Sequence, residues 1–176
     1  MVSVSGYGII SGFTNDGNKI PEQTIPQYYD KLGFSYNKFA DSITVSETEW
    51  DFERYKPDII VINLGTNDMN YATTDERKAE FEDGYLDFLK KVRSLNPDSY
   101  IFQTYGVMGT SLEENIENVR RKYMSETGDE RITFIPLTMQ DEYADGIVAD
   151  WHPSPRTHSL VSQKVTAAIK ETLGYK

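Results

Sequence analysis

Apolar runs separated by longer amphipathic stretches dominate the pattern of this chain. Residues 58–64 read Asp-Ile-Ile-Val-Ile-Asn-Leu and pass directly into Gly-Thr-Asn-Asp at 65–68. Shorter apolar runs follow at 100–105 and 132–137. Short runs rich in β-branched residues are typical of strands buried in a parallel sheet. Because ligands bind at the carboxyl edge of such sheets, the polar segment at 65–68 is the first candidate for a functional site.

Apolar residues recur at helical spacing in three of the remaining stretches. Thr74 can cap a helix that runs from about residue 75 to residue 95. Ser111-x-x-Glu114 is a capping box, which predicts a second helix that continues to about residue 126. Ser154 and the proline after it open the last predicted helix. Its apolar face comprises Leu160, Val161, Val165, Ala168, Ile169 and Leu173.

The rest of the chain predicts little regular structure. Residues 2–4 read as the end of a short strand that opens into a glycine-containing loop. Residues 25–32 predict a short helix, and residues 34–49 an irregular excursion. The alternation of strands and helices predicts one α/β domain over residues 1–176. Its parallel sheet is expected to carry helices on both faces.

Composition narrows the classes of partner. The net charge is −10, which disfavours nucleic acid and anionic lipid. The chain has no Cys, so disulfides and thiolate metal sites are excluded. No apolar run is long enough to span a membrane, and the N-terminus lacks the pattern of a signal peptide. We therefore expect no nucleic-acid or membrane partner, and no residue pattern calls for a cofactor.

His152 is the first candidate for catalysis. It stands between the last predicted strand and the last helix, where a loop can bring its ring to the carboxyl edge of the sheet. A neutral imidazole there can take a proton from a hydroxyl and return it to a leaving group. The alternative is an ordinary histidine in a surface loop. The polar segment at 65–68 favours the catalytic interpretation.

Two further groups could stabilise a developing oxyanion. The side-chain amide of Asn67 can donate a hydrogen bond, although Asn67 could instead close an Asx turn. The backbone N–H of Gly6 is the second candidate donor, and conformational freedom in a turn is its alternative role. Asp68 is expected to be structural and to tie down its turn.

The neighbours of His152 carry three further predictions. The Asp150 carboxylate could orient the imidazole, as the acid of a catalytic triad does. Trp151 could offer a flat face to a sugar ring or an acyl group, or it could cover the core. His158 is expected on an exposed helix face. A metal site built from Asp150, His152 and His158 is the weaker alternative.

These motifs resemble those of the SGNH hydrolases, also called GDSL esterases and lipases. The segment 65–68 is similar to the third block of that superfamily, 150–153 to its fifth, and Ser5-Gly6 to its second. Three segments, 50–64, 105–109 and 152–154 with the following Thr157-His158, narrow the resemblance to carbohydrate esterase family two. The resemblance implies a flavodoxin-like fold with five parallel strands. It also implies an extracellular enzyme that removes O-acetyl groups from a xylan- or mannan-like polysaccharide through an acyl-enzyme. Gly6 and Asn67 would be its oxyanion donors and His152 its general base.

The chain departs from that family pattern in two places. The family acid stands three residues before the histidine, where this chain has Ala149, so the role of Asp150 is in doubt and a backbone carbonyl could orient the ring instead. The Gly-Asp-Ser block that carries the nucleophile has no counterpart before Gly6. We therefore expect the domain to be N-terminally incomplete and to lack its first, central strand. Another chain, a longer parent protein or a rearrangement of this chain would supply that strand.

Ser42 lies in an Ala-Asp-Ser segment that imitates the missing block, but its flanks predict neither the buried strand nor the helix that a nucleophile turn needs. Ser3, Ser5 and Ser11 are weaker candidates still, so the nucleophile is not identified. A non-catalytic carbohydrate-binding relative, or an inactive fragment, is the main alternative to an esterase. A flavodoxin-like domain of unrelated role ranks last.

Overall fold

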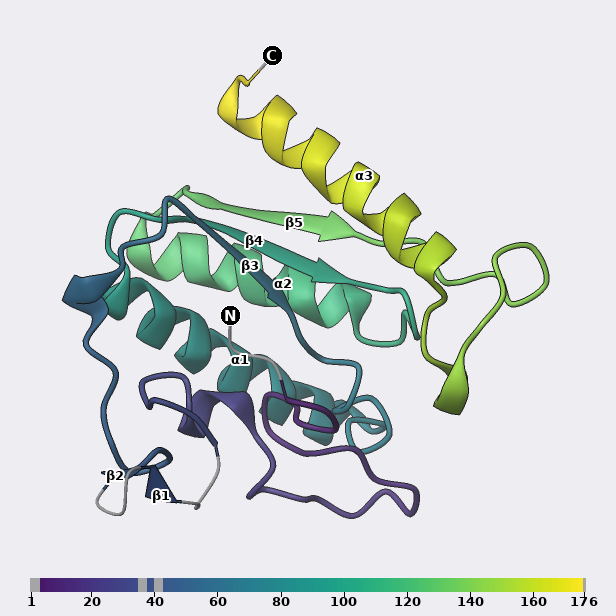
Figure 1. The fold of residues 1–176 in the computed structure, drawn as a ribbon, viewed down its shortest axis with the longest axis horizontal. Helices are drawn as coiled ribbons and strands as arrows, with labels where there is room; N and C mark the ends of the chain where they lie inside the picture. The colour runs from purple at the N-terminus through teal and green to yellow at the C-terminus, as the bar shows by residue number, and fades with distance from the viewer. Residues whose placement is uncertain (1–3, 35–37, 40–42, 176) are drawn as a thin grey trace.

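The computed structural model describes residues 4–34, 38–39 and 43–175. Its main sheet is parallel and has the order β3-β4-β5 (Figure 1). β3 is Ile59–Asn63, β4 is Tyr100–Tyr105 and β5 is Ile132–Pro136. These strands lie where the apolar runs predict them. The predicted α/β class with a parallel sheet is therefore confirmed, and the described sheet has three parallel strands.

Three helices cover the sheet, and their bounds agree with the periodicity of the sequence. They are α1 (Asp75–Leu95), α2 (Glu113–Thr127) and α3 (Pro155–Leu173). The Thr74 side chain accepts a hydrogen bond from the backbone N–H of Arg77, as a helix cap does. Ser154 caps α3 in the same way through the N–H of Thr157.

Short elements complete the described chain. A two-residue antiparallel pair, β1 (Lys38–Phe39) with β2 (Ile43–Thr44), lies within the excursion before β3. The 3-10 helices are η1 (Ile25–Gln27), η2 (Phe52–Arg54) and η3 (Ala149–Trp151). The predicted strand at 2–4 lies mostly outside the described residues, and Val4 is in no strand. Ser3 and Ser42 also lie outside them.

Two helix predictions need correction. The Ser111–Glu114 capping box is wrong, because α2 begins one residue after Leu112 and Leu112 makes no side-chain cap. Leu112 is fully buried, so core packing sets where this helix starts. The helix predicted at 25–32 is shortened to η1. Its first residue pairs instead with the N-terminal loop, since the Ile25 N–H donates to the Gly8 carbonyl at 2.9 Å.

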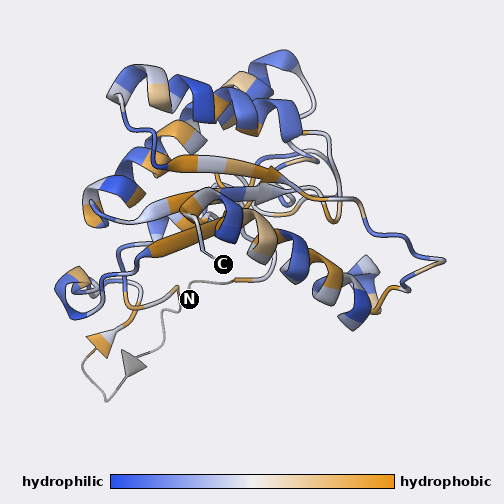
Figure 2. Cartoon of the chain, turned by 90° about the horizontal axis from the view of Figure 1, so that it is seen from above, coloured by the Kyte–Doolittle hydropathy of each residue, from blue (hydrophilic) through white to orange (hydrophobic). Residues whose placement is uncertain are grey.

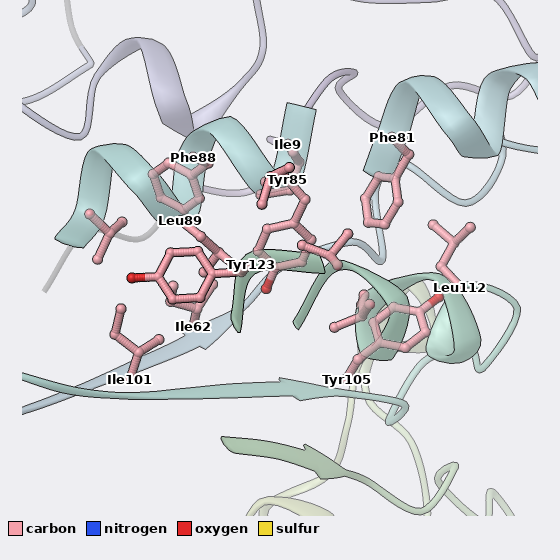
Figure 3. Packing of buried hydrophobic residues seen from close by; sticks show 14 of the residues in the cluster. Ile9, Ile62, Phe81, Tyr85, Phe88, Leu89, Ile101, Tyr105, Leu112 and Tyr123 are labelled. Carbon is pink, nitrogen blue, oxygen red and sulfur yellow. The ribbon is translucent and has the colours of Figure 1, made fainter. Parts of the chain in front are cut away.

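The main core lies between the sheet and the helix pair α1 and α2, whereas α3 covers the opposite face. Figure 3 shows the aromatic rings of Tyr85 and Tyr123 close to Ile62 and Ile101 of the sheet, while Phe81 lies farther along the same core. All five are buried. A buried side chain of this size contributes about 1.5–3 kcal/mol to folding, so this layer contributes strongly to the stability of the sheet.

The face under α3 is less completely covered. Only Thr157 of α3 is buried, and Leu160 is 48% exposed. β3 forms the border of the described sheet, and its Val61 is 47% exposed. Figure 2 shows β3 as an orange, hydrophobic strand at that border, with α3 lying across the sheet. Within the part of the chain that the structure describes, no helix is long and apolar enough to cross a membrane.

Candidate active site at the carboxyl edge of the sheet

The loops that follow β3, β4 and β5 lie at the same edge of the sheet (Figure 1). Gly109, in the loop after β4, lies so close to the loop after β3 that a Cβ added to it would be 2.7 Å from the Met69 Sδ. Gln140, after β5, donates its backbone N–H to the Val107 carbonyl at 3.0 Å. Its side-chain Nε2 donates to the Trp151 carbonyl at 2.7 Å. This chain of contacts links the loop of Asn67 to the segment that carries His152.

Asn67 and the loop of Gly6 are in direct contact. The Asn67 Nδ2 donates to the Tyr7 carbonyl at 2.8 Å across 60 positions of sequence. Gly6 has a φ of +77°, a left-handed conformation that favours glycine. The Gly6 carbonyl accepts from the N–H of Phe13 at 2.7 Å, which closes the loop. An amide carries two N–H groups, so Asn67 keeps a second one for a ligand.

Asp68 holds the same N-terminal loop from the other side. Its Oδ1 accepts from the backbone N–H groups of Ile9, Ile10 and Ser11 at 3.0, 2.8 and 3.0 Å. Its Oδ2 accepts from Ile9 at 2.9 Å. Asp68 is fully buried, and the donors to its carboxylate among the described residues are backbone amides. Sequence analysis expected a structural Asp68 but placed its contacts within its own turn.

Burial raises the pKa of Asp68 to about 6, although the hydrogen bonds from residues 9–11 pull in the opposite direction. Tyr85 of α1 and Tyr105 of β4 also face this charge. Burial, with a smaller contribution from the Asp68 charge, raises the pKa of both phenols. The carboxylate therefore lies in an environment where its charge is costly. Costs of this kind are typical of functional sites.

His152 lies at the end of a strained turn. Asp150 and Trp151 both have positive φ, 54° and 60°. Non-glycine residues pay roughly 1–2 kcal/mol each in that region. The turn is held by the Val148 N–H, which donates to the His152 carbonyl at 2.9 Å, and by the Gln140 side chain.

The ring of His152 is oriented by the backbone. Its Nδ1 lies 3.1 Å from the carbonyl oxygen of Ala149, and a carbonyl can only accept. In a neutral ring that contact assigns the proton to Nδ1 and leaves Nε2 able to accept one. The ring is exposed. Among the described residues, no hydrogen bond or ion pair joins the Asp150 carboxylate to this ring, so the triad role of Asp150 stays a prediction.

Three other residues considered from the sequence, Trp151, His158 and Ser11, are also described by the structure. Trp151 is 62% exposed beside His152, and His158 lies on an exposed face of α3. Ser11 is fully buried; its Oγ donates to the Gly12 carbonyl and accepts from the N–H of Ile20, each at 3.0 Å. Its position is therefore structural.

Across the described ranges, no three His, Asp or Glu side chains are grouped so as to hold a metal ion. No hydrogen bond there joins His152 directly to Asn67 or Gly6. Two surface hollows lie elsewhere, on the outer face of α3 and beside Arg93.

The sequence allows a backbone carbonyl to orient the His152 ring but does not identify it as that of Ala149. It gives no sign of the Gln140 contact with the Trp151 carbonyl or of the distant partners of Asp68. The structure thus has an exposed imidazole and a side-chain amide on loops that follow strands of the same sheet. An imidazole can act as a general base and an amide can stabilise an oxyanion, so these two groups are candidates for ester chemistry.

Comparisons with known proteins agree with this chemistry. Residues 6–160 match the GDSL-like Lipase/Acylhydrolase family. The cellulase/esterase CelE of Acetivibrio thermocellus is 35% identical over 148 residues, which cover 79% of this chain and 17% of that protein. The acetylxylan esterase / glucomannan deacetylase of Cellvibrio japonicus is 23% identical over 178 residues, covering 99% of this chain and 44% of that protein.

Solved structures show the same fold. A family two carbohydrate esterase from Clostridium thermocellum, in complex with cellohexaose, matches with a TM-score of 0.78 and 31% identity over 97% of this chain and 49% of that chain. The acetyl xylan esterase Est2A from the rumen bacterium Butyrivibrio proteoclasticus matches with a TM-score of 0.84 and 24% identity, covering 97% and 50%. This chain spans about half the length of the solved relatives it matches. With a family match over most of its length, the chain belongs to the GDSL-like lipase/acylhydrolase family.

Proposed function

We propose that this chain carries the oxyanion donors and the general base of a serine-type esterase that removes O-acetyl groups from a polysaccharide of the xylan or mannan class. One observation carries the proposal: the Asn67 amide contacts the loop of Gly6, and the segment that follows β5 from the same edge of the sheet carries a His152 ring oriented by the Ala149 carbonyl. The names of the relatives, which are esterases acting on carbohydrate, support the substrate class.

In the proposed reaction a serine oxygen attacks the acetyl carbonyl, and its proton passes to Nε2 of His152. The Gly6 N–H and the second N–H of Asn67 stabilise the oxyanion. Collapse breaks the bond to the sugar oxygen, which takes the proton from His152, and leaves an acetyl-serine. Water then adds by the same route and releases acetate. Throughout, the Ala149 carbonyl holds the Nδ1 proton in place of a triad carboxylate.

We propose further that the serine arrives on an apolar strand that pairs in parallel with β3. β3 is hydrogen-bonded to β4 along one side, and in the described chain no strand pairs with its other side. Parallel strands rich in Ile and Val are normally buried in the middle of a sheet, yet Val61 is 47% exposed. A strand beside β3 would cover Val61. It would end at the edge where Asn67 and His152 lie.

A peptide complementation assay tests both parts. The probe is a synthetic strand, Val-Ile-Val-Ile-Gly-Asp-Ser, added to the chain of residues 1–176, and acetate release is measured from acetylated xylan and from 4-nitrophenyl acetate. The proposal expects turnover that saturates with the peptide. A peptide ending in Gly-Asp-Ala should bind β3 equally well without turnover.

His152→Ala should then lower the rate by about 10²–10⁴-fold, the usual contribution of a general base. His158→Ala, an exposed histidine on α3, is the matched control and should keep the rate. Saturable peptide binding without His152-dependent turnover would contradict the esterase. The second candidate would then gain: carbohydrate binding without turnover, which the exposed Trp151 beside His152 favours. It expects acetylated oligosaccharide to bind and to remain intact.

A further inference from the structure

One buried carboxylate, Asp68, gathers the backbone of the N-terminal loop. It accepts four contacts of 2.8–3.0 Å from three consecutive N–H groups, those of Ile9, Ile10 and Ser11. These residues are 57–59 positions away in sequence, so the carboxylate does far more than close its own turn. Charge-assisted bonds of this kind are about twice as strong as neutral ones. The path of residues 9–11 is therefore set by residue 68.

The same segment is fixed from its other side by packing. Ile10 approaches α1 so closely that a Cβ on Gly84 would lie 2.3 Å from the Ile10 Cγ2. Gly8 packs against the carboxylate itself, and an added Cβ there would lie 2.5 Å from the Asp68 Oδ2. Figure 3 shows Ile9 beside Tyr85, within the main core cluster. The loop is thus packed closely between α1 and the loop after β3.

Both candidate oxyanion donors lie close in sequence to residues that form the Asp68 contacts. Asn67 directly precedes Asp68, and Gly6 lies three residues before Ile9. The Asn67 Nδ2 joins the two through the Tyr7 carbonyl at 2.8 Å. A movement of the Asp68 carboxylate would displace the Gly6 N–H and the Asn67 amide relative to each other. Oxyanion stabilisation depends on such donors being held in place before the reaction.

We propose that Asp68 is the positioning residue of the oxyanion hole, because its carboxylate fixes the loop that carries Gly6 against the loop that carries Asn67. This inference rests on the proposed esterase function for its consequence but not for its geometry. The carboxylate touches neither substrate nor nucleophile and acts through the backbone of residues 8–11. Its ionised form is the one that accepts from all three amides.

Two-dimensional NMR of the chain tests the geometry without any activity. In the wild type, acidification through pH 6 should shift the amide signals of Ile9, Ile10 and Ser11. The Gly6 amide and the Asn67 side-chain amide should move with the same midpoint. Burial raises the pKa of Asp68 into this range, and Tyr85 and Tyr105, which also face it, do not ionise there. This measurement needs no variant, so it stands even if a substitution prevents folding.

Asp68→Asn should abolish that common transition and leave the Gly6 and Asn67 signals at new, pH-independent positions. Asp87→Asn, the same substitution on an exposed residue of α1, should keep the transition. If the Gly6 and Asn67 signals do not follow Ile9–Ser11 in the wild type, or are unmoved by Asp68→Asn, Asp68 holds only its own neighbours and the positioning role is refuted.

In the peptide-complemented enzyme, Asp68→Asn should lower kcat by about 10-fold or more and leave KM within about 2-fold, since loss of one oxyanion donor costs about 10²–10³ in kcat. A purely structural role would lower the amount of folded protein without this split. If the wild type itself shows no turnover, the proposed esterase fails while the NMR result still decides the positioning role.

Discussion

The buried Asp68 should make folding stability depend on pH in an unusual direction. Burial raises its folded-state pKa from 3.8 to about 6, so between those values the folded protein binds more protons than the unfolded chain. Stability from this group is therefore full below pH 3.8 and is lost as the pH rises through 6. Acidic groups whose pKa is lowered by folding act in the opposite direction, because the stability they contribute is lost as the pH falls.

The magnitude follows from the shift. Each pKa unit corresponds to 1.36 kcal/mol, so two units amount to about 3 kcal/mol in full. Between pH 7.5 and pH 4 we expect about 2.5 kcal/mol of that to appear. Carboxylates whose folded-state pKa is lowered, such as Asp129, change stability in the opposite direction as the pH falls. The useful quantity is therefore the difference in unfolding free energy between the wild type and Asp68→Asn, in which those groups cancel.

Urea unfolding followed by tryptophan fluorescence at several pH values measures this difference. On going from pH 7.5 to pH 4, the unfolding free energy of the wild type should rise by about 2.5 kcal/mol relative to that of Asp68→Asn. Asp87→Asn, on the exposed face of α1, should show a flat difference over the same range. A flat difference for Asp68→Asn, or one of opposite sign, would refute the reasoning, because the carboxyl would then not be a costly buried charge.

Three further predictions concern the elements around the site. Gly8→Ala should lower the unfolding free energy measured in urea by about 3 kcal/mol, because its Cβ would lie 2.1 Å from the Ser11 carbonyl oxygen. Gly128 has φ +70° but no atom within 4 Å of an added Cβ, so Gly128→Ala should lower it by only about 1 kcal/mol. Equal losses in the two variants would contradict the close approach at Gly8. Gln140→Ala removes the hydrogen bond to the Trp151 carbonyl and should lower kcat of the complemented enzyme several-fold. Gln163→Ala, at an exposed position of α3, should leave kcat unchanged. Unchanged turnover in Gln140→Ala would show that Gln140 does not position the His152 segment. Val61→Lys should weaken binding of the strand peptide measured by calorimetry, and Val61→Thr should preserve it; equal binding would place the docked strand elsewhere.

Local patterns predicted most of the framework. The periodicity of α1 and its Thr74 cap depend on residues within a few turns of one another, and both are confirmed. The start of α2 depends instead on the burial of Leu112 against distant residues, which the Ser111–Glu114 pattern does not encode. Local patterns therefore locate the elements, while packing decides some of their ends.

The candidate site shows the same division. His152 and Asn67 could be selected by residue type and by their places after predicted strands. The partners of their neighbours could not, because Asp68 reaches residues 57–59 positions away and the His152 ring turns to a backbone carbonyl that any residue could offer. Acceptors of that kind leave no trace in residue type. The strain at Asp150 and Trp151 is equally invisible in the sequence, since glycine stands at neither position.

The proposed esterase requires Asn67 and His152 to serve one shared site. Acetate is the product of the proposed reaction and is therefore a direct probe of that site. In an NMR titration of the chain with sodium acetate, the Asn67 side-chain amide and the His152 ring signals should shift together along one binding curve. Separate curves, or a shift at only one of the two residues, would contradict the account.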